Sequence, residues 1–198
     1  MLKPQLALGL RAHSGWAAAV ALTAPAAQPS VIRRFRLELA DHRIPGSVQP
    51  YHAASKMPST DAERHISRCR AATAALARQA IEHSLNELTD YQVSGACVLL
   101  ASGRPLPDLS RILTSHALIH TAEGEFYRTA LREACETFGL RVAAIRERDL
   151  ALEASRVLNR SAEDLQSAVA GFGRVLGPPW RQDEKLSALA AWLLLTAK

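Results

Sequence analysis

Two kinds of hydrophobic periodicity follow one another along this 198-residue chain, and their order restricts the fold more than any other feature. Three strand-like stretches come first, at residues 5–10, 17–22 and 31–39. Helical and strand-like patterns then alternate: a helix from about residue 60 to 90, a strand at 96–101, a helix at 121–138, a strand at 140–145, and helices to the end. This order predicts a mixed α/β sheet with helices covering its faces.

The connections between the strand-like stretches predict how the strands are ordered. The first two stretches form a hairpin through a short connection that contains Gly15, and the third continues the antiparallel meander. The fourth strand has to return parallel to the first through a right-handed crossover. We therefore expect one domain over residues 1–198, built on a five-stranded sheet in the order 3-2-1-4-5, with the first strand central beside the fourth. A chain that is 48% hydrophobic is long enough to bury such a core.

Hydropathy and cysteine usage predict a cytoplasmic protein with no membrane partner. No stretch approaches 18 consecutive apolar residues, and the N-terminal residues lack the pattern of a secretory signal. Cys69, Cys97 and Cys135 are odd in number, far apart and set among apolar residues. We therefore expect buried thiols rather than a disulfide framework or a Cys-x-x-Cys metal site.

The charge of the chain favours a polyanionic partner. Its 24 basic and 19 acidic residues leave a formal net charge of +5, which suits contact with phosphate backbones. Arg34 and Arg36 share one face of the third predicted strand and are candidates for such contacts. The few aromatic residues are scattered, so the sequence has no interleaved basic and aromatic platform of the kind that binds single strands.

Residues 41–59 show no periodicity and contain three prolines, one glycine and two histidines. This composition predicts a long loop that either lines a site or moves freely. Three helix starts are expected further along, because hydroxyl and carboxylate side chains cap free backbone amides. The candidate caps are Thr121, Asp149 and Ser161.

Three stretches of the sequence resemble a known family. The run Leu8-Gly9-Leu10-Arg11-Ala12-His13-Ser14-Gly15 is similar to the Leu-Gly-Ile-Asp-Pro-Gly-Ser opening of the RuvC-type Holliday-junction resolvases. Residues 121–160 resemble the unit of that family that leads from its fourth to its fifth strand. Residues 183–190 resemble its terminal Asp-Ala-x-Asp-Ala-Leu-Ala helix. These matches are spread over most of the chain, from residue 8 to residue 190, and imply a ribonuclease H-like fold.

The catalytic motif of that family is degenerate in this chain. The family holds two Mg²⁺ ions with carboxylates, because hard cations require oxygen ligands. Arg11 stands where the first-strand Asp is expected, Ser102 stands near the fourth-strand Glu, and Ser187 takes the second acidic position of the last helix. Asp183 or Glu184 retains an acid at the start of that helix. Either the catalytic residues have migrated or the nuclease activity has been lost.

Several polar residues lie at predicted strand ends or helix starts, where an open α/β sheet builds its site. Arg11 is a candidate phosphate clamp, because its planar guanidinium fits phosphate oxygens, or else it forms an ion pair. In the family-like geometry we expect it to pair with Asp183 or Glu184. The other candidates for phosphate binding are His13, Ser14 and Lys185.

His116, His120 and Glu123 are spaced i, i+4 and i+7, which places them on one face of a continuous helix. On that face they are metal ligands, or they act as acid and base. Otherwise the histidines are surface or capping residues, separated by a helix start at Thr121. Asp183 and Glu184 are either site residues or acids that the dipole of the last helix favours.

These features leave three functional hypotheses. The resemblance implies a diverged nuclease acting on nucleic acid, with DNA favoured, with Mg²⁺ or Mn²⁺ on Asp183, Glu184 and Glu123, and with His120 as base or ligand. The second hypothesis is a module without catalysis or cofactor that binds nucleic acid or a protein, a second copy of itself included. The third is a phosphate-ester or nucleotide enzyme that uses residues 11–14 as its phosphate loop.

Overall fold

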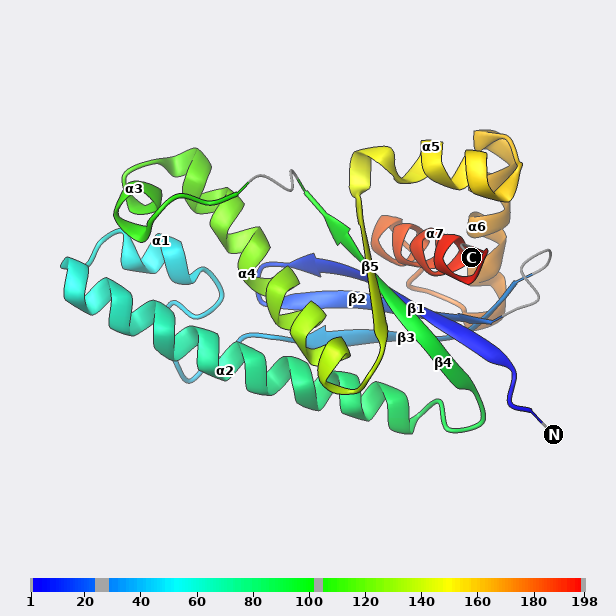
Figure 1. Cartoon of the computed structure of the whole chain (residues 1–198), viewed down its shortest axis with the longest axis horizontal. Helices are drawn as coiled ribbons and strands as arrows, with labels where there is room; N and C mark the ends of the chain where they lie inside the picture. Colours follow the sequence, from blue (N-terminus) through cyan, green and yellow to red (C-terminus); the bar gives the residue numbers. More distant parts are fainter. Residues whose placement is uncertain (1, 24–28, 102–104, 197–198) are drawn as a thin grey trace.

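The computed structural model describes residues 2–23, 29–101 and 105–196 and contains one five-stranded sheet (Figure 1). Its strand order is β3-β2-β1-β4-β5, as predicted, with the first strand in the centre. β1, β2 and β3 pair antiparallel, whereas β4 runs parallel to both β1 and β5. The bounds of the strands are β1 Gln5–His13, β2 Trp16–Thr23, β3 Ser30–Glu38, β4 Gln92–Leu100 and β5 Arg141–Arg146.

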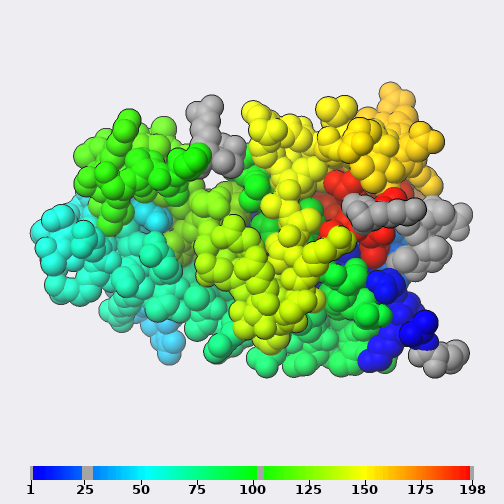
Figure 2. Space-filling view, in the orientation of Figure 1, coloured from blue at the N-terminus to red at the C-terminus, as the bar shows by residue number. Residues whose placement is uncertain are grey.

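Helices cover both faces of the sheet (Figure 1). One face carries α1 (Pro50–Ala54), α2 (Ser59–Asn86), α3 (Leu109–Leu113) and α4 (His116–Thr137). The other carries α5 (Glu147–Leu158), α6 (Ala162–Leu176) and α7 (Gln182–Thr196). In the space-filling view part of α7 is visible below α5 and α6 (Figure 2). Among the described residues, no helix combines the length and apolar character that crossing a membrane requires.

Alternation along β1 assigns its side chains to two separate cores. Leu6, Leu8 and Leu10 are fully buried on the side of α2 and α4. Ala7 is buried on the side of α7, and with a period of two Gly9 and Arg11 share that side. The end of β1 therefore presents a cation toward the helix that closes the chain.

Gly9 lets α7 approach the backbone of β1. A Cβ atom at this position would lie 1.8 Å from the carbonyl oxygen of Ser187 and 2.9 Å from the amide nitrogen of Ala191. Ser187 is fully buried, and its Oγ donates to the carbonyl of Ala18 on β2 at 3.3 Å. The start of α7 is thereby fixed over the carboxyl end of β1.

Two helix starts differ from the expectation. Residues 41–59 are not loop throughout, because Pro50 begins the short α1. α4 begins at His116, where the Oγ of Ser115 accepts a hydrogen bond from the Leu118 amide. Thr121 is therefore inside the helix rather than its cap, and its hydroxyl donates to the Ala117 carbonyl. One continuous helix thus carries His116, His120 and Glu123.

The start of α5 also differs from the expectation, which placed its cap at Asp149. The helix begins at Glu147, so Asp149 is not its cap and instead accepts a hydrogen bond from Nε of Arg146. The cap predicted at Ser161 is confirmed, because its Oγ accepts from the Asp164 amide at 3.0 Å.

Candidate functional site

The carboxyl ends of β1 and β5 meet the start of α7 in a cluster of charged residues. Nε and Nη2 of Arg11 donate to the two carboxylate oxygens of Glu147, each at 2.9 Å. Nη1 of the same guanidinium donates to Asp183 at the start of α7. The expected pairing of Arg11 with the acidic start of the last helix is confirmed for Asp183, and Glu147 is a second partner that sequence reasoning did not identify.

Aromatic side chains extend this cluster toward β3. Nε2 of His13 lies 2.9 Å from Oδ1 of Asp183 and 2.9 Å from Nη1 of Arg11. The His13 ring stacks on Trp16 with the ring centroids 4.4 Å apart. The guanidinium of Arg36 lies on Trp16 in turn, 3.9 Å from the ring centroid. A row of cationic and aromatic groups therefore borders the two carboxylates.

The electrostatics keep Arg11 charged. The hydrogen bonds that Arg11 donates to Glu147 raise the pKa of Arg11, burial opposes this, and the charges of Glu147 and Asp183 raise the pKa further. Arg128 on α4 is nearby, since the charges of Glu147 and Arg11 both act on it. Burial lowers the pKa of Arg128, and its Nε donates to the Leu99 carbonyl at 3.0 Å. The cluster thus combines two acids with two guanidinium groups.

Arg34, a predicted nucleic-acid contact, holds the segment that leads into α7. Its Nη1 donates to the carbonyls of Gly177 at 2.7 Å and Pro179 at 2.6 Å, and its Nη2 donates to that of Pro178 at 2.7 Å. Three hydrogen bonds from these two nitrogens reach one short stretch of backbone. Arg34 therefore positions the approach to Asp183 rather than standing free on the strand face.

Replacing Arg34 with alanine should lower the free energy of unfolding by about 1.5–3 kcal/mol. A hydrogen bond that involves a charged group contributes about that much, and water can replace part of the three that are lost because the carbonyls are partly exposed. Arg33→Ala is the matched control on the same strand. Its ion pair with Glu87 is half exposed, and exposed pairs contribute less than about 1 kcal/mol. Urea denaturation of both variants measures the difference, and equal losses would contradict a positioning role for Arg34.

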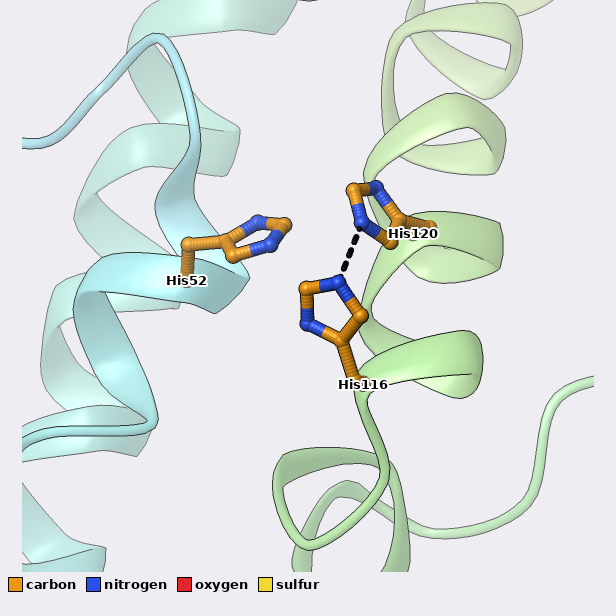
Figure 3. A group of neighbouring side chains, drawn as sticks. All are labelled: His52, His116 and His120. Atoms are coloured by element: carbon orange, nitrogen blue, oxygen red, sulfur yellow. Dashed lines mark hydrogen bonds between the residues drawn. The ribbon is translucent and has the colours of Figure 1, made fainter.

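A second group of polar residues joins α1 to α4. His52 on α1 faces His116 and His120 on α4 (Figure 3). The Nε2 atoms of His116 and His120 are 2.9 Å apart, and the His52 ring centroid lies 4.8 Å from that of His120 and 5.6 Å from that of His116. One ligand atom from each of the three residues lies within 4.8 Å of the others. His52 is half-buried, and the other two are exposed.

Glu123 lies behind this group, in the interior. Its Oε1 accepts hydrogen bonds from the backbone amides of Tyr51 at 2.9 Å and His52 at 3.0 Å, and Nδ1 of His52 lies 3.3 Å away. Its Oε2 is buried without a hydrogen-bond partner in the described part of the chain. Burial raises the pKa of Glu123, although its hydrogen bonds oppose this. Glu123 therefore anchors α1 and the His52 ring to α4.

The comparisons identify the fold. Neither a family model nor a curated protein matches the sequence. Among solved structures, Thermus thermophilus RuvC in complex with a Holliday junction substrate matches 96% of this chain and 93% of its own, with a TM-score of 0.54 and 10% identity. A further structure of Thermus thermophilus RuvC matches 98% of both chains, with a TM-score of 0.52 and 9% identity.

The chain has the RuvC-type, ribonuclease H-like fold.

The two-Mg²⁺ centre implied by this fold does not fit the residues at the strand end. Such a centre needs several carboxylate oxygens free to bind the ions. Here the guanidinium of Arg11 binds both oxygens of Glu147 and one of Asp183. A permanent cation of the protein therefore occupies the carboxylates that would hold the metal, and the buried hydroxyl of Ser187 adds no acidic ligand.

The other predicted site residues lie in different surroundings. Oε2 of Glu184 accepts from the Arg181 amide at 2.7 Å, so this acid caps its own helix. Lys185 is half-buried on the first turn of α7, and Ser14 is exposed in the turn between β1 and β2. Ser102 lies outside the described residues. Asp183, Glu184 and Glu123 do not gather within 4.8 Å of one another, unlike the three histidines, and their metal-binding roles stay predictions.

Proposed function

We propose that the protein binds nucleic acid, preferentially DNA, and does not cut it with a two-metal centre. The binding surface is the face around the carboxyl ends of β1 and β5 and the start of α7, called the strand-end face below. One observation carries the proposal: Arg11 is held by Glu147 and Asp183 at the position where this fold places its metal ligands. Because Arg11 is paired with both carboxylates, they are not free to hold a metal ion that would activate water, and phosphate binding falls to the exposed arginines around the cluster. Binding is therefore the chemistry that this arrangement supports best.

Further cations around the strand end support the same proposal. A groove of about 370 Å³ beside Asp183 is lined by Trp16, Arg36 and Arg181. On the other side of the cluster, Arg146 and Arg148 flank Glu147 at the start of α5, and both are exposed. Arginines from β3, β5, α5 and the start of α7 thus surround the acidic pair. Because guanidinium groups displace counterions from phosphates, this face suits a polyanion.

We expect labelled duplex and four-way-junction DNA to be retained at about 50 mM salt and released as salt rises toward about 200 mM, as counterion release requires. The double variant Arg148→Ala, Arg181→Ala should lower the slope of log affinity against log salt by about two, one for each lost phosphate contact. The control is the double variant Arg70→Ala, Arg78→Ala on the exposed side of α2, which should bind like the parent.

Fluorescence anisotropy in the absence of divalent ions measures both quantities. If no DNA is retained at about 50 mM salt, the nucleic-acid role is wrong, because binding should be strong under that condition. A protein-interaction module on the same fold would then be the better account. If the control pair weakens binding as much as the test pair, the DNA does not lie on the strand-end face.

A further inference from the structure

We propose that His52, His116 and His120 bind one divalent transition-metal ion of the Zn²⁺ type. The site is separate from the charged cluster at the carboxyl ends of β1 and β5 and does not depend on the proposed binding of nucleic acid. Its ligands come from two elements, α1 and α4, that the sequence alone does not bring together.

The rings already approach the arrangement that a metal requires. His116 and His120 are one turn apart on α4, and their Nε2 atoms point at each other across 2.9 Å (Figure 3). Bonds of about 2.0–2.1 Å from zinc to nitrogen in a tetrahedral site imply roughly 3.4 Å between donor atoms. The three donors lie within 4.8 Å of one another, so rotations of the side chains are sufficient to close the site.

Glu123 orients the ring that comes from α1. Its Oε1 lies 3.3 Å from Nδ1 of His52 and also accepts the backbone amide of the same residue. A proton on Nδ1 shared with this carboxylate leaves Nε2 of His52 as the ligand atom. Histidine ligands of metals commonly donate their second ring nitrogen to a carboxylate in this way, which fixes the tautomer and raises the basicity of the ligand.

The donor set selects the class of ion. Three imidazole nitrogens suit Zn²⁺, Co²⁺, Ni²⁺ or Cu²⁺, whereas Mg²⁺ requires oxygen ligands. Three protein ligands leave a fourth position for water, the arrangement found in zinc sites that exchange a ligand. Because His116 and His120 are exposed, that position faces solvent. A bound ion would also tie α1 to α4 at the point where Glu123 already joins them.

The test is a titration of tag-free protein with Co²⁺, followed by competition with Zn²⁺. We expect one ion per chain, with visible absorption bands of a four-coordinate site. Removing a hydrogen-bond partner of a metal ligand weakens metal binding about 10- to 100-fold. His52→Ala and His120→Ala each remove a ligand itself, so each should weaken binding by more than that. His83→Ala is the matched control, because His83 is exposed on α2 away from the group, and it should bind like the parent.

Two results would overturn the proposal. The first is a parent protein that binds Co²⁺ no better than a variant lacking both His116 and His120. The second is a His52→Ala variant that binds as tightly as the parent, which would show that two histidines on a helix surface act alone. Circular dichroism of each variant confirms that the fold persists. Since the substituted rings are exposed or half-buried, we expect unchanged spectra.

Discussion

Arg11→Ala should lower the free energy of unfolding by about 2–3 kcal/mol. The substitution leaves Glu147 and Asp183 without their shared cation at the end of β1. Breaking an enclosed ion pair costs about 3–5 kcal/mol, and an exposed pair contributes less than about 1 kcal/mol. The Arg11 side chain is 21% exposed and that of Asp183 is 23% exposed, so the loss should fall between these limits.

Urea denaturation measures the effect, with Arg156→Ala as the control. Arg156 forms an i,i+3 pair with Glu153 on α5 and is 72% exposed, so its loss should change the free energy by less than about 0.5 kcal/mol. Arg11→Lys should restore only part of the stability, because an ammonium group does not reproduce the two parallel hydrogen bonds to Glu147. If Arg11→Ala unfolds at the same urea concentration as the parent, the paired cluster is not part of the folded state.

Gly9→Ala should be at least as damaging, with an expected loss of about 3 kcal/mol or more. The added Cβ would clash with the carbonyl oxygen of Ser187 and the amide nitrogen of Ala191. These are backbone atoms, so no side-chain rotation can relieve the clash. Relief requires α7 to move away from β1 as a unit. Because Asp183 lies at the start of α7, the same movement would also loosen its bond to Arg11.

Gly171→Ala is the matched control for this prediction. Gly171 is inside α6, and a Cβ at that position would have no atom within 4 Å. Alanine is favoured over glycine in a helix interior by about 1 kcal/mol, so this variant should be slightly more stable than the parent. Thermal unfolding should move in opposite directions for the two substitutions. A Gly9→Ala variant as stable as Gly171→Ala would contradict the close packing of α7 on β1.

The topology could be predicted from the sequence because period-two and period-3.6 patterns follow one another clearly. Once the order of elements along the chain was known, the rule that crossovers are right-handed was enough to predict the order of the strands in the sheet. The pairing of Arg11 with Asp183 was also predictable, since the fold brings the end of the first strand to the start of the last helix. This contact was predicted only through the resemblance to the family, because local sequence patterns carry no information about two residues that are 172 positions apart.

Glu147 and His52 were missed for reasons of local structure. The step from β5 into α5 occurs between Arg146 and Glu147 without a capping side chain, so Asp149 carried the only visible helix-start signal. His52 belongs to a five-residue helix, which is too short to show periodicity. The spacing of His116, His120 and Glu123 did predict a shared face of α4. It could not predict that a histidine from α1 would complete the group.

The most direct test of the account is to incubate the protein with a labelled four-way junction in Mg²⁺ or Mn²⁺. Samples are analysed in parallel on native and denaturing gels, with Asp183→Asn beside the parent. We predict a shifted band on the native gel and intact strands on the denaturing gel, because Arg11 occupies the carboxylates. Strand cleavage by the parent that is lost in Asp183→Asn would contradict the account, since it would require a metal centre at the strand end.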